Sequence, residues 1–209
     1  MSFTLFHGLR PDHRTDAARL YWAVFGSKLG RVLGPEADAL RFIRRVMDET
    51  HVISALDQHG DLAGVIGYRT HEGTFVGGSW HDLAAVYGPG GALWRGVCLS
   101  TLALDTERRA MMVDGFAVRE DMRGAGVGKA LLTELGTEAL RRGFPFLRLD
   151  VVDENLRARA LYDRLGFDVI RRRHSRLTEA VFGFRSAHVM MRDLRREAPP
   201  RPRRPATRA

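Results

Sequence analysis

Residues 113–129 read VDGFAVREDMRGAGVGK, and this stretch decides the fold of the chain. It opens as a β-strand that ends at Val118 and closes where a helix begins at Gly128. Between them, glycines at alternate positions remove Cβ atoms, so an anion can approach the main chain closely (Gly124, Gly126 and Gly128). The helix adds unpaired N–H groups and the positive end of its dipole, and Arg123 and Lys129 add charge. The stretch therefore predicts a site for a phosphate or a pyrophosphate.

The loop does not fit the two common nucleotide-binding patterns. Its glycines are not spaced as G-x-G-x-x-G, and no ribose-binding acid follows at the spacing of a dinucleotide-binding unit. No Lys-Ser or Lys-Thr pair closes the loop, which argues against a P-loop. A plain strand-to-helix turn without a ligand stays open from these residues alone.

A second stretch, Asn155–Phe167, reads NLRARALYDRLGF. With the loop before it, this stretch resembles the GNAT superfamily of acyl-CoA N-acyltransferases, whose phosphate loop reads R/Q-x-x-G-x-G/A and whose later motif reads N-x-x-A-x-x-L-Y-x-x-x-G-F. The later motif is matched at Asn155, Ala158, Leu161, Tyr162, Gly166 and Phe167. The chain departs from the family at Glu120, where proline is usual, and in the long stretch 71–108, which leaves the acceptor side open.

The resemblance implies an α/β (α+β) fold with a central mixed, mostly antiparallel sheet of six to seven strands. The sheet splays between strands 4 and 5, and helices flank both of its faces. The implied co-substrate is acetyl-CoA, whose pantetheine arm would lie in the splay and pair with main-chain groups of Phe116, Ala117 and Val118. The pyrophosphate would contact the loop that follows (Arg123, Gly124, Ala125, Gly126, Val127, Gly128 and Lys129). Asn155 would contact the cofactor or cap its helix.

Two residues are candidates for catalysis. The resemblance implies that Tyr162 is the general acid for the departing CoA thiolate, and mere packing of its ring is the alternative. Asp114 on the fourth strand is the candidate base, on the expectation that it shares a face with Phe116 and Val118, and a surface acid at the end of the strand is the alternative. Other groups near the expected acceptor side are open as bases, as is water (His71, Glu72, His81 and Glu107). A strand-four N–H would hold the tetrahedral oxyanion.

Apolar periodicity predicts the remaining elements of one domain, residues 1–195. Helices are expected at 14–33, 36–49, 92–104, 128–142 and 156–165, and strands at 3–9, 51–56, 62–68, 111–118, 146–152, 167–173 and 188–194. Residues 71–91 are rich in glycine and carry no clear pattern. Trp80, Tyr87 and Trp94 either line an acceptor pocket or belong to the core. Residues 196–209 are rich in proline and arginine, and we expect this tail to be disordered.

The charge and cysteine content bound the class of protein. The net charge is +8, and the tail from residue 195 on holds six arginines against one acid, so the folded body is only mildly basic. Nucleic acid is therefore an unlikely partner, although a basic binding module stays a weak alternative, as does a non-catalytic acyl-CoA sensor. Cys98 is the single cysteine, and no signal peptide or membrane span is seen. We expect a cytoplasmic monomer or homodimer that binds acyl-CoA and an amine acceptor, without a metal.

Overall fold

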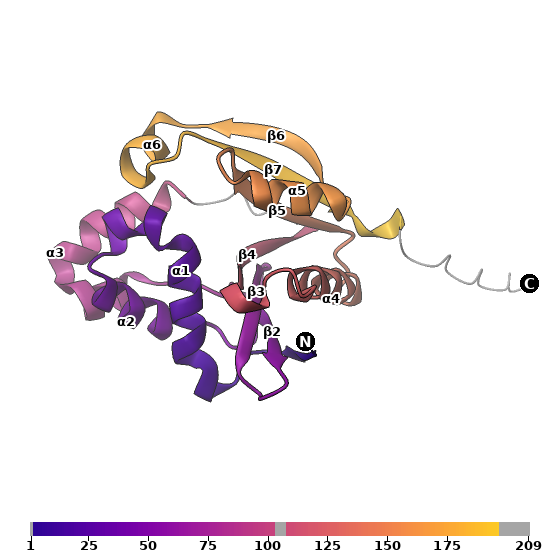
Figure 1. Cartoon of the computed structure of the whole chain (residues 1–209). Helices are drawn as coiled ribbons and strands as arrows, with labels where there is room; N and C mark the ends of the chain where they lie inside the picture. The colour runs from indigo at the N-terminus through magenta and orange to yellow at the C-terminus, as the bar shows by residue number, and fades with distance from the viewer. Residues whose placement is uncertain (1, 103–107, 197–209) are drawn as a thin grey trace, which may run out of the picture.

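The computed structural model describes residues 2–102 and 108–196. Their centre is one seven-stranded sheet in the order β1-β2-β3-β4-β5-β7-β6 (Figure 1). Neighbouring strands are antiparallel except for β4 and β5. The strands are β1 (Phe3–His7), β2 (Val52–Asp57), β3 (Leu62–Arg69), β4 (Ala110–Val118), β5 (Phe146–Val152), β6 (Asp168–His174) and β7 (Ser186–Asp193). The expected mixed, mostly antiparallel sheet is confirmed.

Helices cover both faces of the sheet, as expected. They are α1 (Arg14–Leu33), α2 (Glu36–Val46), α3 (Trp80–Ser100), α4 (Val127–Arg141), α5 (Leu156–Arg164) and α6 (Arg176–Phe182). One face packs on α4 and α5, and the other face of β2–β4 packs on α1 and α2. Helix α3 packs outside α1 and α2, and the three lie together on one side of the molecule (Figure 1).

Helix α4 joins the candidate phosphate loop to the core. Its buried stripe recurs at helical spacing, as the sequence predicts (Leu131, Leu132, Leu135 and Ala139). These side chains pack against Leu147 and Leu149 of β5 in the same cluster. Burial of each leucine contributes about 1.5–3 kcal/mol to folding, so this face fixes where the first turn of the helix lies.

The sheet splays between β4 and β5. Only three residue pairs join the two strands, Ala110 with Phe146, Met111 with Leu147 and Met112 with Arg148. Both strands continue well past these pairs, β4 to Val118 and β5 to Val152. The expected gap between strands 4 and 5 is therefore confirmed, and its vertex lies at Met112 and Arg148.

A β-bulge interrupts β4 just past this vertex. Ile66 pairs with Phe116 but Tyr68 pairs with Val113, so Asp114 and Gly115 together oppose Gly67. Gly115 has a φ of +102°, and a Cβ there would lie 2.8 Å from the Tyr21 ring. A second glycine is needed opposite, because a Cβ at Gly67 would lie 2.5 Å from the Asp114 carbonyl oxygen.

The bulge corrects one expectation about Asp114. The side chains of Val113, Phe116 and Val118 pack on the α4 face of the sheet. The Asp114 side chain instead bonds to residues of the β3–α3 segment on the opposite face. The expectation that Asp114, Phe116 and Val118 share one face is therefore wrong, because regular alternation does not survive an extra residue in the strand.

The spacing of apolar residues did not predict the first half of helix α3 or any of helix α6. Helix α3 begins at Trp80 behind a capping box of Ser79 and Asp82, and it has a kink at Gly88, which precedes Pro89. Its second half corresponds to the helix expected at 92–104, whose end lies outside the described residues. Gly88 and Pro89 hid the first half because both residues break helical patterns. Helix α6 has seven residues, too short to show a helical period.

A buried carboxylate near the end of α4 stabilises the fold. Glu138 is 3% exposed and accepts hydrogen bonds from Arg141 at 2.6 and 2.7 Å and from Arg142 at 2.5 Å. The hydrogen bonds from Arg141, aided by those from Arg142, lower the pKa of Glu138 to about 2 against the opposing effect of burial. The stabilisation is therefore present above the ordinary glutamate pKa and is lost as the pH falls toward the lowered value.

We expect Glu138→Gln to lower the free energy of unfolding at neutral pH by about 1.5–3 kcal/mol, because charge-assisted hydrogen bonds are lost. The control is Glu134→Gln, one turn earlier, where only an exposed contact to His7 is changed. Urea denaturation should show the gap between Glu138→Gln and the wild type closing as the pH falls below about 4. Equal stability of the two variants at neutral pH would contradict this role.

Candidate functional site

The loop before α4 exposes its main chain. Gly124 and Gly126 have φ values of +87° and +86°, and a Cβ at either position would meet no atom within 4 Å. The N–H of Ala130 makes the first bond of the helix, to the Gly126 carbonyl at 3.0 Å. The N–H groups of residues 127–129 therefore have no acceptor within the helix, and they point out of its positive end. Such a main chain suits an anion.

Gly128, the third glycine of the loop, is required for helix packing. A Cβ at Gly128 would lie 3.1 Å from the Phe116 ring and 3.8 Å from Val118, so this position needs a glycine for α4 to pack closely on β4. Arg123 is exposed, and its Nε donates to the Val118 carbonyl at 3.3 Å. Lys129 is exposed on the first turn. Anion contact by Arg123, Ala125, Val127 and Lys129 stays a prediction.

The end of β4 offers main-chain groups to the splay. On one side, Phe116, Ala117 and Val118 pair with Ile66, Val65 and Gly64 of β3. On the other side β5 has already separated from β4, since their pairing ends at Met112. A chain lying in the gap would therefore meet the β5-facing edge of this segment, as strand addition requires.

Asn155 and Tyr162 stand at the two ends of α5. The Asn155 Oδ1 accepts a hydrogen bond from the Ala158 N–H at 3.1 Å, so this residue caps the helix. Tyr162 is 8% exposed, and its ring centroid lies 6.4 Å from that of Phe116 and 5.8 Å from that of Phe167. Burial raises the pKa of Tyr162 to about 12. A buried phenol thus lies beside the β4 arm of the splay and stays protonated at ordinary pH.

A cavity of about 880 Å³ opens on the other face of the sheet. Its walls come from α1, α2, α3, α6 and the ends of β5, β6 and β7, and much of the lining is apolar (Leu29, Leu33, Phe42, Leu83, Leu99 and Phe184). Trp80 also lines it. Trp94 is 44% exposed, and the hydroxyl of Tyr87 donates to the Leu33 carbonyl at 2.7 Å. Of the three aromatic residues singled out above, only Trp80 is among the lining residues.

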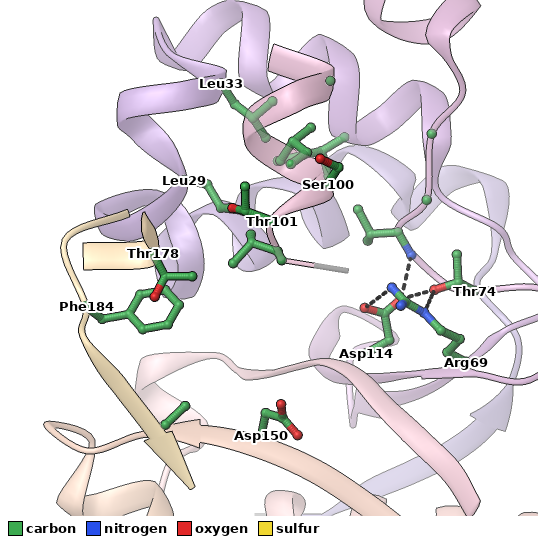
Figure 2. Close-up of a pocket in the computed structure, with 18 of the residues that line it drawn as sticks. Leu29, Leu33, Arg69, Thr74, Ser100, Thr101, Asp114, Asp150, Thr178 and Phe184 are labelled. Atoms are coloured by element: carbon green, nitrogen blue, oxygen red, sulfur yellow. Dashed lines mark hydrogen bonds and ion pairs between the residues drawn. The ribbon is translucent and has the colours of Figure 1, made fainter. Parts of the chain in front are cut away.

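Asp114 lies in this cavity and is held firmly there. Its Oδ2 accepts a hydrogen bond from the Thr74 hydroxyl and another from the Val76 N–H at 3.3 Å. The Arg69 guanidinium lies 3.6 Å from its Oδ1, as Figure 2 shows. Burial raises the pKa of the neighbouring Tyr21, and the charge of Asp114 adds to the rise.

The other candidate bases lie elsewhere. His71, Glu72 and His81 are exposed, and none of them is among the residues that line the cavity. Glu72 lies 3.5 Å from Arg142, near the far end of α4. Glu107 lies outside the described residues.

Asp150 of β5 is a second carboxylate in the cavity, and sequence reasoning missed it (Figure 2). Burial raises its pKa, while Arg148 and Arg173 lower it by smaller amounts. The signal was present in the strand FLRLDVV, where Leu147, Leu149 and Val151 face the core on the α4 side and Asp150, between the last two, lines the cavity. An acid at a cavity-facing position of a central strand is a candidate functional group.

The geometry fits a family comparison. The sequence model of the Acetyltransferase (GNAT) family matches residues 15–167. The chain belongs to this family. The match includes the glycine loop, both arms of the splay and the whole of α5, so the resemblance noted from the two motifs is confirmed. No curated protein matches the chain in sequence.

Solved acetyltransferase structures share this GNAT fold at low sequence identity. An N-acetyltransferase from Staphylococcus aureus Mu50 is 19% identical with a TM-score of 0.66, over 90% of this chain and 99% of that one. A GCN5-related N-acetyltransferase from Kribbella flavida is 18% identical with a TM-score of 0.61, over 91% and 97%. The ribosomal-protein-S18-alanine N-acetyltransferase of Escherichia coli is 17% identical with a TM-score of 0.52, over 92% and 94%.

Family membership supports acyl transfer as the general activity of this GNAT protein. Among residues 2–102 and 108–196, no helix combines the length and apolar character needed to cross a bilayer. In the same part of the chain, no group of three His, Cys, Asp or Glu side chains is arranged to hold a metal ion.

Proposed function

We propose that this protein transfers an acetyl group from acetyl-CoA to an amine. One observation carries the proposal: the open main chain of residues 124–129 lies at the head of a splay between β4 and β5. A phosphate-bearing molecule with an extended, amide-containing arm matches both features. The pyrophosphate would contact the loop, and the arm would pair with Phe116, Ala117 and Val118. Asn155 is proposed to contact the same molecule while it caps α5.

The reaction follows from which groups flank the splay. The amine approaches from the cavity and attacks the thioester carbon, so a C–N bond forms and the C–S bond breaks. The proton lost by nitrogen passes to one of the two carboxylates that line the cavity, Asp114 or Asp150, and a β4 N–H stabilises the oxyanion. Tyr162 donates its O–H to the departing sulfur from the opposite face.

The acceptor is proposed to be a primary amine, on a small molecule or on a protein. One structural neighbour is named as an N-acetyltransferase for an alanine of a ribosomal protein. The cavity of about 880 Å³ admits a group of substantial size beside the thioester. A non-catalytic acyl-CoA sensor would share the same acyl-CoA site but show no turnover. A cytoplasmic location and a monomeric or dimeric state stay predictions.

The test is thermal unfolding with acetyl-CoA, followed by thiol release over a panel of primary amines. We expect acetyl-CoA at about 100 times its Kd to stabilise the folded state by about 2.7 kcal/mol. S-acetylpantetheine, which lacks the pyrophosphate, should give a much smaller shift at the same concentration. We also expect at least one amine to accelerate thiol release. Stabilisation without any amine-dependent release would favour the sensor, and no stabilisation would overturn the proposal.

A further inference from the structure

Asp114 and Asp150 occupy matching places on the two arms of the splay. Met112 and Arg148 are the last paired residues of β4 and β5, and each carboxylate lies two residues further along its strand. Both side chains point to the cavity face, since both line the cavity. Whatever enters the cavity toward the vertex of the splay therefore comes between two acids that have different surroundings.

Both carboxylate oxygens of Asp114 have partners within the protein. Thr74 and the Val76 N–H both bond to its Oδ2, and Arg69 lies beside its Oδ1. Both oxygens of the Asp114 carboxylate are therefore already engaged by neighbouring groups, and its place on the cavity wall suits a binding contact with the nitrogen of an amine.

Asp150 is different. Its side chain is 14% exposed, and within residues 2–102 and 108–196 its Oδ1 accepts no hydrogen bond. The nearest cations lie at ion-pair distance, Arg148 Nε 3.6 Å from Oδ1 and Arg173 Nη1 3.6 Å from Oδ2. Desolvation, the largest effect, raises the pKa of Asp150, and Arg148, Arg173 and Arg171 oppose the rise. A carboxylate with a raised pKa is a stronger base when it is ionised.

The charged groups around Asp150 come from its own strand, from β6 beyond β7, and from other walls of the cavity. Arg148 lies on β5 itself, Arg171 and Arg173 lie on β6, and the β7 residue paired with it is the apolar Val189. Asp114, Arg69, His174 and Arg185 also line the cavity. The His174 Nε2 accepts from Arg185 at 2.9 Å, and its Nδ1 lies 3.0 Å from the Ser186 hydroxyl. Asp114 and Asp150 are therefore the acids among the lining residues.

We propose that Asp150 takes the proton that the amine nitrogen loses as it bonds to the thioester carbon, and that Asp114 is the carboxylate beside which the amine binds. This assignment rests on the acetyl transfer proposed above. The attacking R–NH₂ becomes positively charged when the C–N bond forms, and the N–H electron pair stays on nitrogen as the proton moves to Asp150. The C–S electron pair leaves with sulfur, which then receives a proton from Tyr162 or water.

The probe is 2-phenylethylamine, a primary amine whose ring suits the apolar walls of the cavity, and water is the second acceptor in samples without amine. Thiol release at saturating acetyl-CoA is followed against pH for the wild type, Asp150→Asn and Asp114→Asn. We expect wild-type kcat to rise with pH through the titration of Asp150. Asp150→Asn should lower kcat roughly 100-fold and remove that limb while KM for the amine changes little. Asp114→Asn should mainly raise KM.

Asp150→Glu keeps a carboxylate, so it should restore part of kcat and the pH limb. The wild-type kcat and its rise with pH are measured without any variant, so the test stays valid if Asp150→Asn folds poorly. A wild-type profile without the limb, or Asp150→Asn with unchanged kcat, would overturn the assignment. The acetyl-CoA-induced rise in melting temperature is recorded in parallel. If the wild type shows neither this rise nor thiol release, the proposed function itself fails.

Discussion

Gly126→Leu should abolish the stabilisation of this protein by acetyl-CoA. The added side chain projects from the N-cap of α4 into the open space in front of the loop, where a Cβ meets no atom within 4 Å. That space is where the pyrophosphate is proposed to lie. For a chain of this size, saturating acetyl-CoA should raise the wild-type melting temperature by about 5–10 °C, and the variant should show none of this rise.

Gly143→Leu is a closely matched control. Gly143 follows the other end of α4, its φ is +85° against +86° at Gly126, and a Cβ there also meets nothing within 4 Å. Both substitutions place an L-residue in the left-handed region, at a cost of roughly 1–2 kcal/mol each. Both variants should therefore melt at similar, lowered temperatures, and only Gly143→Leu should keep the acetyl-CoA shift. A full acetyl-CoA shift in Gly126→Leu, or an equal loss of that shift in both variants, would contradict the proposed pyrophosphate site at the glycine loop.

The parts of the fold near the two motifs could be predicted from the sequence. The glycine loop and the stripe of α4 depend on local spacing, whereas the divergence of β4 from β5 was expected only from the family resemblance, and all three lie where they were expected. The face of Asp114 could not be predicted by alternation, because Gly115 and Gly67 permit a bulge that no period-two pattern contains. A single glycine in a strand is nevertheless a recognised sign of a bulge, so Gly115 indicated that one could occur here.

The acceptor side was the least predictable part of the candidate site. The cavity is built from α1, α2, α3, α6 and the ends of several strands, which are far apart in sequence. No motif links Leu33 to Phe184, and only packing brings them to one space. Asp150 shows the same limit. Its place on a strand was predicted, but its burial and its arginine neighbours depend on how β5, β6 and β7 pair.

The splay joins two chemically different faces of one sheet. On the α4 face, Tyr162 lies against Phe116 in an apolar cluster, where a group that carries no charge is stable. On the cavity face, Asp114 and Asp150 stand among arginines. In the proposed reaction, a thioester held in the gap would meet a hydrogen-bond donor, Tyr162, from one side and a proton acceptor, Asp150, from the other. The leaving sulfur would gain charge on the first side while the attacking nitrogen loses a proton on the second.

Tyr162→Phe should lower kcat by roughly 30- to 1000-fold while acetyl-CoA binding stays almost intact, because loss of a hydrogen bond to a developing anion costs about 2–4 kcal/mol. The effect is confined to the reaction path, since the sulfur gains charge only there. Phenylalanine keeps the ring contacts with Phe116 and Phe167, so packing survives. Because burial raises the pKa of Tyr162 to about 12, the hydroxyl should cause no fall in kcat at any pH well below that value.

Tyr68→Phe separates this role from the general loss of a buried hydroxyl. The Tyr68 hydroxyl donates to the Thr50 carbonyl at 2.8 Å and accepts from Arg142 at 2.8 Å, so it contacts the C-terminal end of α4, opposite to the end that carries the glycine loop. Its removal should lower the melting temperature and leave kcat unchanged. Tyr162→Phe should instead lower kcat and leave the melting temperature nearly unchanged. Thiol release at saturating acetyl-CoA measures both, and a single-turnover experiment shows whether product release limits the rate. An unchanged single-turnover rate in Tyr162→Phe would assign the residue to packing and leave protonation of the thiolate to water.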